Sequence, residues 1–257
     1  MSIHFENISF AYPEAPLLMK DFSLSVHKGD FVAIVGPSGI GKSTLVSLCL
    51  SLLNPTTGSI RMNNLGAAEA ISRGHTAVMF QQSALLPWMS LWQNVCFPFE
   101  ASGTPAPEQE IHDLLDRVGL KTSRHLLPSQ LSGGMQTRAA LVRALGQNPE
   151  FLFLDEPFTG LDQASREELS ELVVKLWSTR EHTTLMVTHD INEAVYMADH
   201  VLVIDERPMK VKLDIEIGFA RPRHSSIRQT QQFVDYVARV RNHLSNCCSS
   251  GETGGVK

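Results

Sequence analysis

The chain has 257 residues, 43% of them hydrophobic and 19% charged, which suits a packed core and argues against wholesale disorder. Its formal charge of -5 argues against a protein whose main task is to coat nucleic acid, because phosphate binding needs clustered positive charge. The sequence has neither about 18 uninterrupted apolar residues for a membrane span nor the basic start and apolar centre of a signal peptide, so we expect the protein inside the cell.

The beginning of the chain differs in pattern from the later residues. Apolar and polar residues alternate at 3–5, 8–10 and 22–26, which predicts an antiparallel flank. From residue 31 onward, short apolar runs alternate with helical patterns and indicate an α/β core. The runs predicted as buried parallel strands lie at 31–35, 76–80, 151–154, 184–187 and 201–204. The helical patterns lie at 42–53, 109–118, 136–146 and 165–177.

The remaining segments predict a loop, a terminal helix and a tail. Residues 101–107 are small and Pro-rich and predict a loop, whereas the Gly- and Ser-rich residues 249–257 predict a flexible tail. Between these two segments, the stretch 207–241 is basic, and its later part belongs to a helix with one apolar face. This helix is expected to dock on the core. A regulatory role and lipid-headgroup binding are the alternatives. That face consists of Phe233, Val237, Val240 and Leu244. The cysteines lack metal-ligand or redox spacing and are predicted to be unpaired: Cys49, Cys96, Cys247 and Cys248.

One segment matches the phosphate-binding pattern G-x-x-x-x-G-K-[ST] between a predicted strand and a predicted helix. It comprises Gly36, Pro37, Ser38, Gly39, Ile40, Gly41, Lys42 and Ser43, here called the phosphate loop, and Thr44 directly after it is included in the predicted nucleotide contacts. The glycines let backbone N–H groups wrap a phosphate chain, and Lys42 adds a positive charge near the β- and γ-phosphates. The Ser43 hydroxyl suits Mg²⁺, which prefers hard oxygen ligands.

A second signal is an apolar run that ends in two carboxylates, Asp155 and Glu156. Ligands of doubly wound sheets sit beyond the carboxyl ends of the strands, so this edge is a candidate active site. Asp155 is predicted to hold Mg²⁺, directly or through water, and Glu156 to orient or deprotonate the water that attacks the γ-phosphate. A helix cap or a surface turn is the alternative, because Pro157 is the next residue.

A third signal is the Ser-Gly-Gly turn of Ser132, Gly133 and Gly134, which opens a predicted helix. A helix N-terminus attracts anions, so this turn is a second candidate phosphate site, although a plain helix N-cap explains Ser132 equally well. We call residues 131–135 the signature segment.

Together these motifs resemble the ATP-binding cassette (ABC) ATPases across nearly the whole chain. The signature segment resembles the signature motif of that family, with Met135 in place of the usual Gln. The resemblance implies that Tyr12 stacks on adenine and that Gln81 senses Mg²⁺ and the γ-phosphate. It also implies that Asp162 is the acid of a loop that crosses a dimer interface and that His189 is a switch histidine at the γ-phosphate. The predicted catalytic set is then Glu156, His189 and Gln81, and the predicted metal ligands are Ser43, Gln81 and Asp155.

The resemblance also implies a fold and two cofactors. We expect an α/β fold, in which a P-loop NTPase (RecA-like) core carries an antiparallel β flank and an inserted helical subdomain at about 83–145. The ATP-binding domain is expected at 1–230, followed by a C-terminal helix and tail at 231–257. The cofactors are ATP and Mg²⁺.

In that family two cassettes face each other head to tail, so that each ATP lies between one phosphate loop and the other chain's signature segment. We therefore expect a second ATPase subunit as partner, most simply a second copy in a homodimer, together with integral membrane permease subunits and a solute-binding protein. The apolar residues 84–89 are a candidate docking segment for the permease, with packing inside the subdomain as the alternative for Trp88. The chain is expected at the cytoplasmic face of the inner membrane as a peripheral subunit.

Short strings at 85–88, 93–95 and 221–223 resemble the importer branch for nitrate, sulfonate and taurine. An ATPase of an exporter is the main alternative, because exporters share every catalytic motif. An ABC ATPase acting on DNA or ribosomes is disfavoured by the negative charge and by the lack of a long coiled-coil insertion or a tandem cassette, so no nucleic-acid partner is expected. A GTPase is excluded because no Asn-Lys-x-Asp comes after the phosphate loop.

Overall fold

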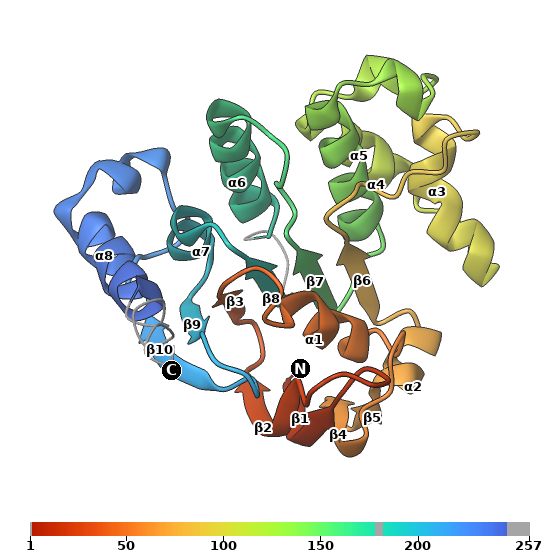
Figure 1. Cartoon of the computed structure of the whole chain (residues 1–257). Coiled ribbons are helices and arrows are strands. Elements are labelled where there is room, and N and C mark those ends of the chain that lie inside the picture. Colours follow the sequence, from red (N-terminus) through yellow and green to blue (C-terminus); the bar gives the residue numbers. More distant parts are fainter. Residues whose placement is uncertain (1, 178–181, 246–257) are drawn as a thin grey trace, which may run out of the picture.

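A six-stranded sheet forms the centre of the computed structural model, which describes residues 2–177 and 182–245 (Figure 1). Its strand order is β10-β9-β3-β8-β7-β6, with every neighbouring pair parallel except β9 and β10. The five predicted strands are confirmed as β3 (Phe31–Val35), β6 (Thr76–Met79), β7 (Phe151–Asp155), β8 (Thr183–Thr188) and β9 (His200–Ile204). The edge strand β10 (Val211–Glu216), which we did not predict, is only half buried.

The predicted antiparallel flank supplies two strands of a separate four-stranded sheet, drawn at the bottom of Figure 1, whose other two strands at 57–66 we did not predict. Its order is β2-β1-β4-β5, with bounds Met19–Val26, Ile3–Phe10, Thr57–Met62 and Leu65–Gly66. The two short runs predicted in the first ten residues form one strand, β1. Its pairing with β2 shifts register between Phe5 and Ile8, where Asn7 has a left-handed φ of 50°, and this irregularity explains why the pattern broke there.

The helices α3 (Leu91–Ser102), α4 (Glu108–Arg117) and α5 (Gly133–Gly146) lie together beyond the β6 edge of the sheet (Figure 1). The other helices are α1 (Lys42–Cys49), α2 (Ala67–Ser72), α6 (Gln163–Trp177), α7 (Ile191–Met197) and α8 (Gln231–Ser245), with short 3₁₀ turns at Lys121–Ser123, Pro128–Gln130 and Ser225–Gln229.

The bounds predicted for one helix and one loop are wrong. The first helix stops at Cys49 rather than continuing to residue 53, and Ser51 beyond it has a left-handed φ of 51°, which does not fit a helix. The loop predicted at 101–107 begins later, because α3 continues to Ser102 and ends at Gly103, whose φ of 70° makes it a typical helix C-cap.

The buried core lies on both faces of the six-stranded sheet, because alternate residues of each strand point to opposite faces. Phe31, Ala33 and Val35 pack with the helices α3 to α8, whereas Val32 and Ile34 pack with α1 and the antiparallel flank. This two-sided burial holds the carboxyl ends of β3, β7 and β8 in register, and the candidate site lies there.

The C-terminal helix α8 docks on the core as expected, with Phe233, Val237 and Val240 buried and Leu244 partly buried. Cys49 and Cys96 are buried and unpaired, whereas Cys247, Cys248 and the predicted tail lie outside the described residues. Among residues 2–177 and 182–245, no helix is both long and apolar enough to cross a membrane. The division of the chain into domains at 83–145 and at 230 stays a prediction.

Candidate nucleotide-binding and hydrolysis site

The phosphate loop joins the end of β3 to the start of α1, the strand–loop–helix context that its sequence pattern requires. At Gly36 a Cβ atom would lie 2.3 Å from the backbone oxygen of Ile204, so only glycine fits that close approach. Gly41 caps α1 with a φ of 112°, a conformation that L side chains rarely adopt. These glycines therefore fix a tight turn whose helix N-terminus is positioned to bind an anion.

Lys42 is a buried cation on this loop, with 4% of its surface exposed. Its Nζ donates hydrogen bonds to the carbonyl oxygens of Gly36 at 2.8 Å and Pro37 at 3.0 Å and lies 3.8 Å from Glu156 Oε1. Burial lowers the pKa of Lys42, and the carboxylates of Glu156 and Asp155 oppose that shift. The ammonium is thus held at the loop by acceptors on both sides, where a polyphosphate chain would find a positive charge.

Ser43 and Asp155 come together where the carboxyl ends of β3 and β7 share one edge of the sheet. The Ser43 hydroxyl donates a 2.8 Å hydrogen bond to Asp155 Oδ1. Burial raises the pKa of Asp155, and this hydrogen bond opposes the shift. A hydroxyl and a carboxylate this close form a pair of hard oxygen donors, so the residues present fit a Mg²⁺ ion.

Glu156 sits in a strained backbone position directly after β7. Its φ is 45°, and its N–H donates a 2.8 Å hydrogen bond to the carbonyl of Val187 in β8. The Oε2 atom accepts a 3.1 Å hydrogen bond from Thr159 Oγ1 and lies 3.1 Å from His189 Nδ1. The turn that we weighed as the alternative is present, and it holds the carboxylate against the phosphate loop.

A cavity of about 320 Å³ gathers these groups. Its lining comprises Ser38, Gly39, Gly41, Lys42, Ser43, Thr44, Gln81 and Glu156. A cavity of about 750 Å³ lies between α4, α5 and α6, and the phosphate loop contributes nothing to its lining. The smaller cavity is therefore the candidate site, because it alone of the two combines a phosphate-binding backbone, a cation and a carboxylate.

Tyr12, which the family resemblance assigns to adenine stacking, lies beside the start of α1. Its hydroxyl is 3.0 Å from Thr44 Oγ1, and its ring meets Phe10 edge to face with centroids 5.0 Å apart. With 43% of its surface exposed, the ring remains accessible for stacking. Its contact with adenine stays a prediction.

The signature segment and Asp162 lie away from the cavity. Ser132 caps α5 by accepting a 3.3 Å hydrogen bond from the N–H of Met135, and neither it nor Gly133 or Gly134 is among the described residues that line the cavity. The Asp162 carboxylate accepts hydrogen bonds from Ser165 Oγ and from the Ser165 N–H, which lower its pKa. One chain therefore assembles only the phosphate-loop half of the site that the resemblance implies.

His189 reaches the site from the loop between β8 and α7. Its side chain is 48% exposed, and its Nδ1 lies against Glu156 rather than against the phosphate loop. Two of the predicted catalytic residues, Glu156 and His189, are thus in direct contact, and the third, Gln81, lines the same cavity as Glu156.

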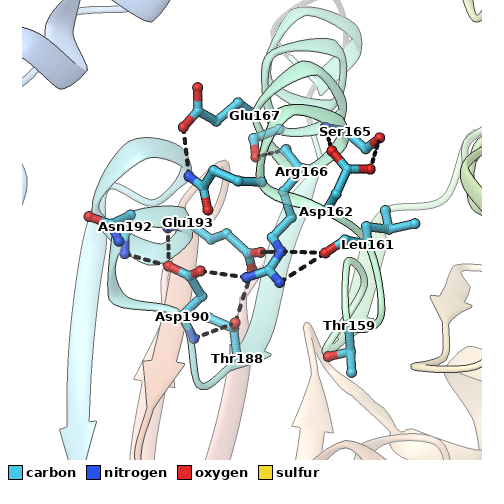
Figure 2. A network of polar contacts seen from close by, with 12 residues as sticks. Thr159, Leu161, Asp162, Ser165, Arg166, Glu167, Thr188, Asp190, Asn192 and Glu193 are labelled. Atoms are coloured by element: carbon cyan, nitrogen blue, oxygen red, sulfur yellow. Dashed lines mark hydrogen bonds and ion pairs between the residues drawn. The ribbon is translucent and has the colours of Figure 1, made fainter.

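Sequence reasoning missed Arg166, which Figure 2 shows pointing from α6 toward Leu161 and Asp190. It also missed Thr159 and the buried Glu193. The spacing of Asp190 and Glu193 at the start of α7 is that of a capping box and could have indicated a local network. No sequence signal indicated Arg166, because its carboxylate partner Asp190 lies in another loop, 24 residues further along the chain.

Known proteins similar to this chain include ATP-binding subunits of transporters. A family model described as "ABC transporter" matches residues 19–159. The nitrate import ATP-binding protein NrtD of Synechococcus elongatus is 38% identical over 229 residues, which cover 86% of this chain and 83% of that protein. The aliphatic sulfonates import ATP-binding protein SsuB 1 of Agrobacterium fabrum is 37% identical, over 95% of this chain and 84% of that protein. The bicarbonate transport ATP-binding protein CmpD of a Synechocystis species is 37% identical, over 85% and 79%.

Two solved structures share the fold. One is a dimeric ATP-binding cassette in a post-hydrolysis state with ADP and Pi, with a TM-score of 0.72, 29% identity and coverage of 84% of this chain and 100% of that one. The other is a dimeric bacterial ABC transporter cassette, with a TM-score of 0.73, 30% identity and the same coverage. The expected α/β fold of a P-loop NTPase is confirmed.

Proposed function

The chain belongs to the ABC transporter family and is an ATPase, and from this premise we propose that it powers the import of a small solute through separate membrane subunits. The solute class is that of nitrate, sulfonates, taurine and related small nutrients. The observation that carries the importer assignment is that relatives named for nitrate, sulfonate and bicarbonate match more than four fifths of this chain. The main alternative remains an exporter ATPase.

For hydrolysis, the residues in and around the cavity have distinct tasks. The phosphate loop and Lys42 bind and neutralise the phosphate chain, and Tyr12 and Thr44 border the nucleoside side. Ser43, Asp155 and Gln81 would hold Mg²⁺, which supplies charge neutralisation at the phosphate oxygens when bound. Glu156 orients the attacking water and accepts its proton, and His189 beside it holds the carboxylate and contacts the γ-phosphate. The contact that supports these roles is the 3.1 Å approach of His189 Nδ1 to Glu156 Oε2.

We assign the missing half of the site to a second ATPase subunit, most simply a second copy of this chain. The signature segment is supported as that half because Ser132 and Gly133 are exposed at the start of α5 and lie outside the cavity of their own chain. Asp162 lies at the same interface in this arrangement. ATP then closes the dimer by bridging both chains, and loss of the γ-phosphate opens it.

Residues 84–89 are the proposed docking segment for the membrane permease. Arg143 donates hydrogen bonds to the carbonyl oxygens of Ser83 at 2.9 Å and Ala84 at 2.8 Å, and the buried Asn94 bonds to both backbone groups of Leu86. Trp88 nevertheless leaves 71% of its surface exposed, which speaks against the alternative that it packs inside the helical subdomain. A fixed segment with an exposed aromatic side chain suits a partner helix.

The proposal places the chain at the cytoplasmic face of the membrane, with a solute-binding protein reached through the complex. Co-purification of the tagged full-length chain from membranes tests it, with the bound proteins identified by mass spectrometry. Recovery of a permease and a solute-binding protein supports import. A permease without a solute-binding protein supports the exporter, and recovery with ribosomes or DNA contradicts both.

A further inference from the structure

Arg166, near the start of α6, bridges two loops, the one directly before α6 and the one that carries His189 (Figure 2). Its Nε and Nη2 donate hydrogen bonds of 3.3 and 2.9 Å to the carbonyl oxygen of Leu161. Its Nη1 donates a 3.0 Å hydrogen bond to Asp190 Oδ2. Leu161 belongs to residues 160–162, here the crossing loop, and Asp190 directly follows His189. One guanidinium thus joins the crossing loop to the loop of the switch histidine.

Residues 188–190, here the switch loop, are tied to Arg166 on both sides of His189. On one side, Asp190 Oδ1 caps α7 by accepting from the N–H groups of Asn192 and Glu193. On the other side, Thr188 Oγ1 accepts a 3.0 Å hydrogen bond from the N–H of Asp190 and donates one of 3.0 Å to Glu193 Oε2. Glu193 Oε1 in turn lies 4.0 Å from Arg166 Nε. The backbone that carries His189 therefore moves only if this network rearranges.

The crossing loop has fewer internal ties. Gly160 has a φ of 84°, and the Leu161 N–H makes only a long 3.3 Å hydrogen bond to the carbonyl of Phe158. The paired donors of Arg166 fix the Leu161 carbonyl, which lies directly before Asp162. Guanidinium is suited to this task because its planar fork donates to a carbonyl and a carboxylate at the same time, which a lysine ammonium on a flexible stem does less well.

We propose that Arg166 is a positioning residue that couples the crossing loop to His189. The position of the crossing loop then determines where the His189 imidazole lies relative to Glu156. The inference rests on the proposed function, because it takes His189 and Glu156 as the hydrolytic pair. A second chain that contacts the crossing loop then acts on hydrolysis through Leu161, Arg166 and Asp190. Arg166 itself is not among the described residues that line the cavity.

The test compares Arg166→Gln with Arg138→Gln in the full-length chain, by steady-state ATP hydrolysis with Mg²⁺. Arg138 is a matched control: it is similarly exposed and also pairs with a carboxylate, Glu168 on α6, but contacts neither loop. For Arg166→Gln we expect kcat to fall between about tenfold and a hundredfold, because small misplacements of a catalytic group have such effects, with KM for ATP within about twofold of wild type. Arg166→Lys is expected to restore part of kcat, since its charge still pairs with Asp190. The control is expected to match wild type, and an Arg166→Gln variant with wild-type kcat overturns the proposal.

A double variant separates action through His189 from a general structural effect. If Arg166 acts through the imidazole, Arg166→Gln combined with His189→Ala hydrolyses radiolabelled ATP as slowly as His189→Ala alone. A further loss by the full Arg166→Gln factor overturns the proposal. Should Arg166→Gln fail to fold, Asp190→Asn in the same comparison replaces it, because Asn keeps the helix cap and loses the charge.

Failure of the proposed function gives a different result. If His189→Ala hydrolyses ATP as fast as wild type, the roles proposed for His189 and for Arg166 are both wrong. If His189→Ala is slow and Arg166→Gln is not, only the coupling proposed here is wrong.

Discussion

The Ser43 hydroxyl meets the Asp155 carboxylate through a 2.8 Å hydrogen bond, although 112 residues separate them in the chain. Ser43 lies in the first turn of α1 after β3, and Asp155 is the last residue of β7. Only β8 lies between these strands in the sheet, and all three run parallel, so their carboxyl ends share one edge. The candidate hydrolytic site is a consequence of this strand order.

The first prediction concerns these two oxygens. Ser43→Ala is expected to raise the Mg²⁺ concentration needed for half-maximal hydrolysis by at least about tenfold, because one hard ligand is lost. Titration of Mg²⁺ at saturating ATP measures this. Ser47→Ala, which removes a hydroxyl one turn further along α1, is the control and should titrate like wild type. An unchanged titration for Ser43→Ala contradicts the ligand role.

A second prediction concerns the buried ammonium of Lys42. Lys42→Met is expected to weaken ATP binding between about tenfold and a hundredfold, the range for loss of a charge-assisted hydrogen bond to phosphate. Equilibrium binding of ATP in the presence of EDTA, which prevents hydrolysis, measures the effect. The exposed Lys210→Met variant provides the control. Equal affinity in Lys42→Met and wild type would show that the cavity is not the phosphate site.

A third prediction concerns Glu193, whose side chain is buried and whose pKa is raised by that burial and by Asp190 to about 7, against an ordinary value of 4.5. Thr188, Arg166 and Arg228 oppose the shift. Between these two pH values the unfolded chain releases a proton that the folded chain keeps, so wild-type stability falls as pH rises and levels off above about 7.

Glu193→Gln removes this titration. As pH rises from 4.5 to 7, the free energy of unfolding of wild type is therefore expected to fall by about 3 kcal/mol relative to that of the variant. Urea unfolding at a series of pH values measures the difference. A difference that stays constant with pH contradicts the burial of an ionisable carboxyl at this position.

Parts of the fold could be predicted because the signal is local. The strands β3 and β7 are continuous apolar runs because both of their faces are buried. The edge strand β10 escaped prediction because it is half exposed, and α7 because its seven residues are too few for a helical pattern. The helix α3 was missed because it contains Pro98.

The candidate site likewise contains residues with a local sequence signal and residues without one. Gly36 and Lys42 belong to a contiguous motif, so the sequence alone predicts their role. The contact of Arg166 with Asp190 depends on how α6 packs against the loop after β8, which no short pattern encodes. Long-range polar partners of this kind are visible only in the folded chain.

A fourth prediction separates catalysis from docking. Trp88→Ala is expected to leave basal ATP hydrolysis unchanged and to alter stability by less than about 0.5 kcal/mol, because the ring is exposed. Co-purification of the permease with the variant should be lost. Leu52→Ala removes another exposed apolar side chain, far from residues 84–89 in sequence, and the permease should still co-purify with this variant. Full permease recovery with Trp88→Ala would rule out the docking role.

The central claim is that two chains share each ATP and that Glu156 hydrolyses it. Glu156→Gln preserves the side-chain shape but cannot accept the proton of the attacking water, so bound ATP should persist and hold the dimer closed. The most direct measurement is the mass of this variant by light scattering with and without ATP. We predict the mass of two chains with ATP and of one chain without it. A single-chain mass at saturating ATP would contradict the account.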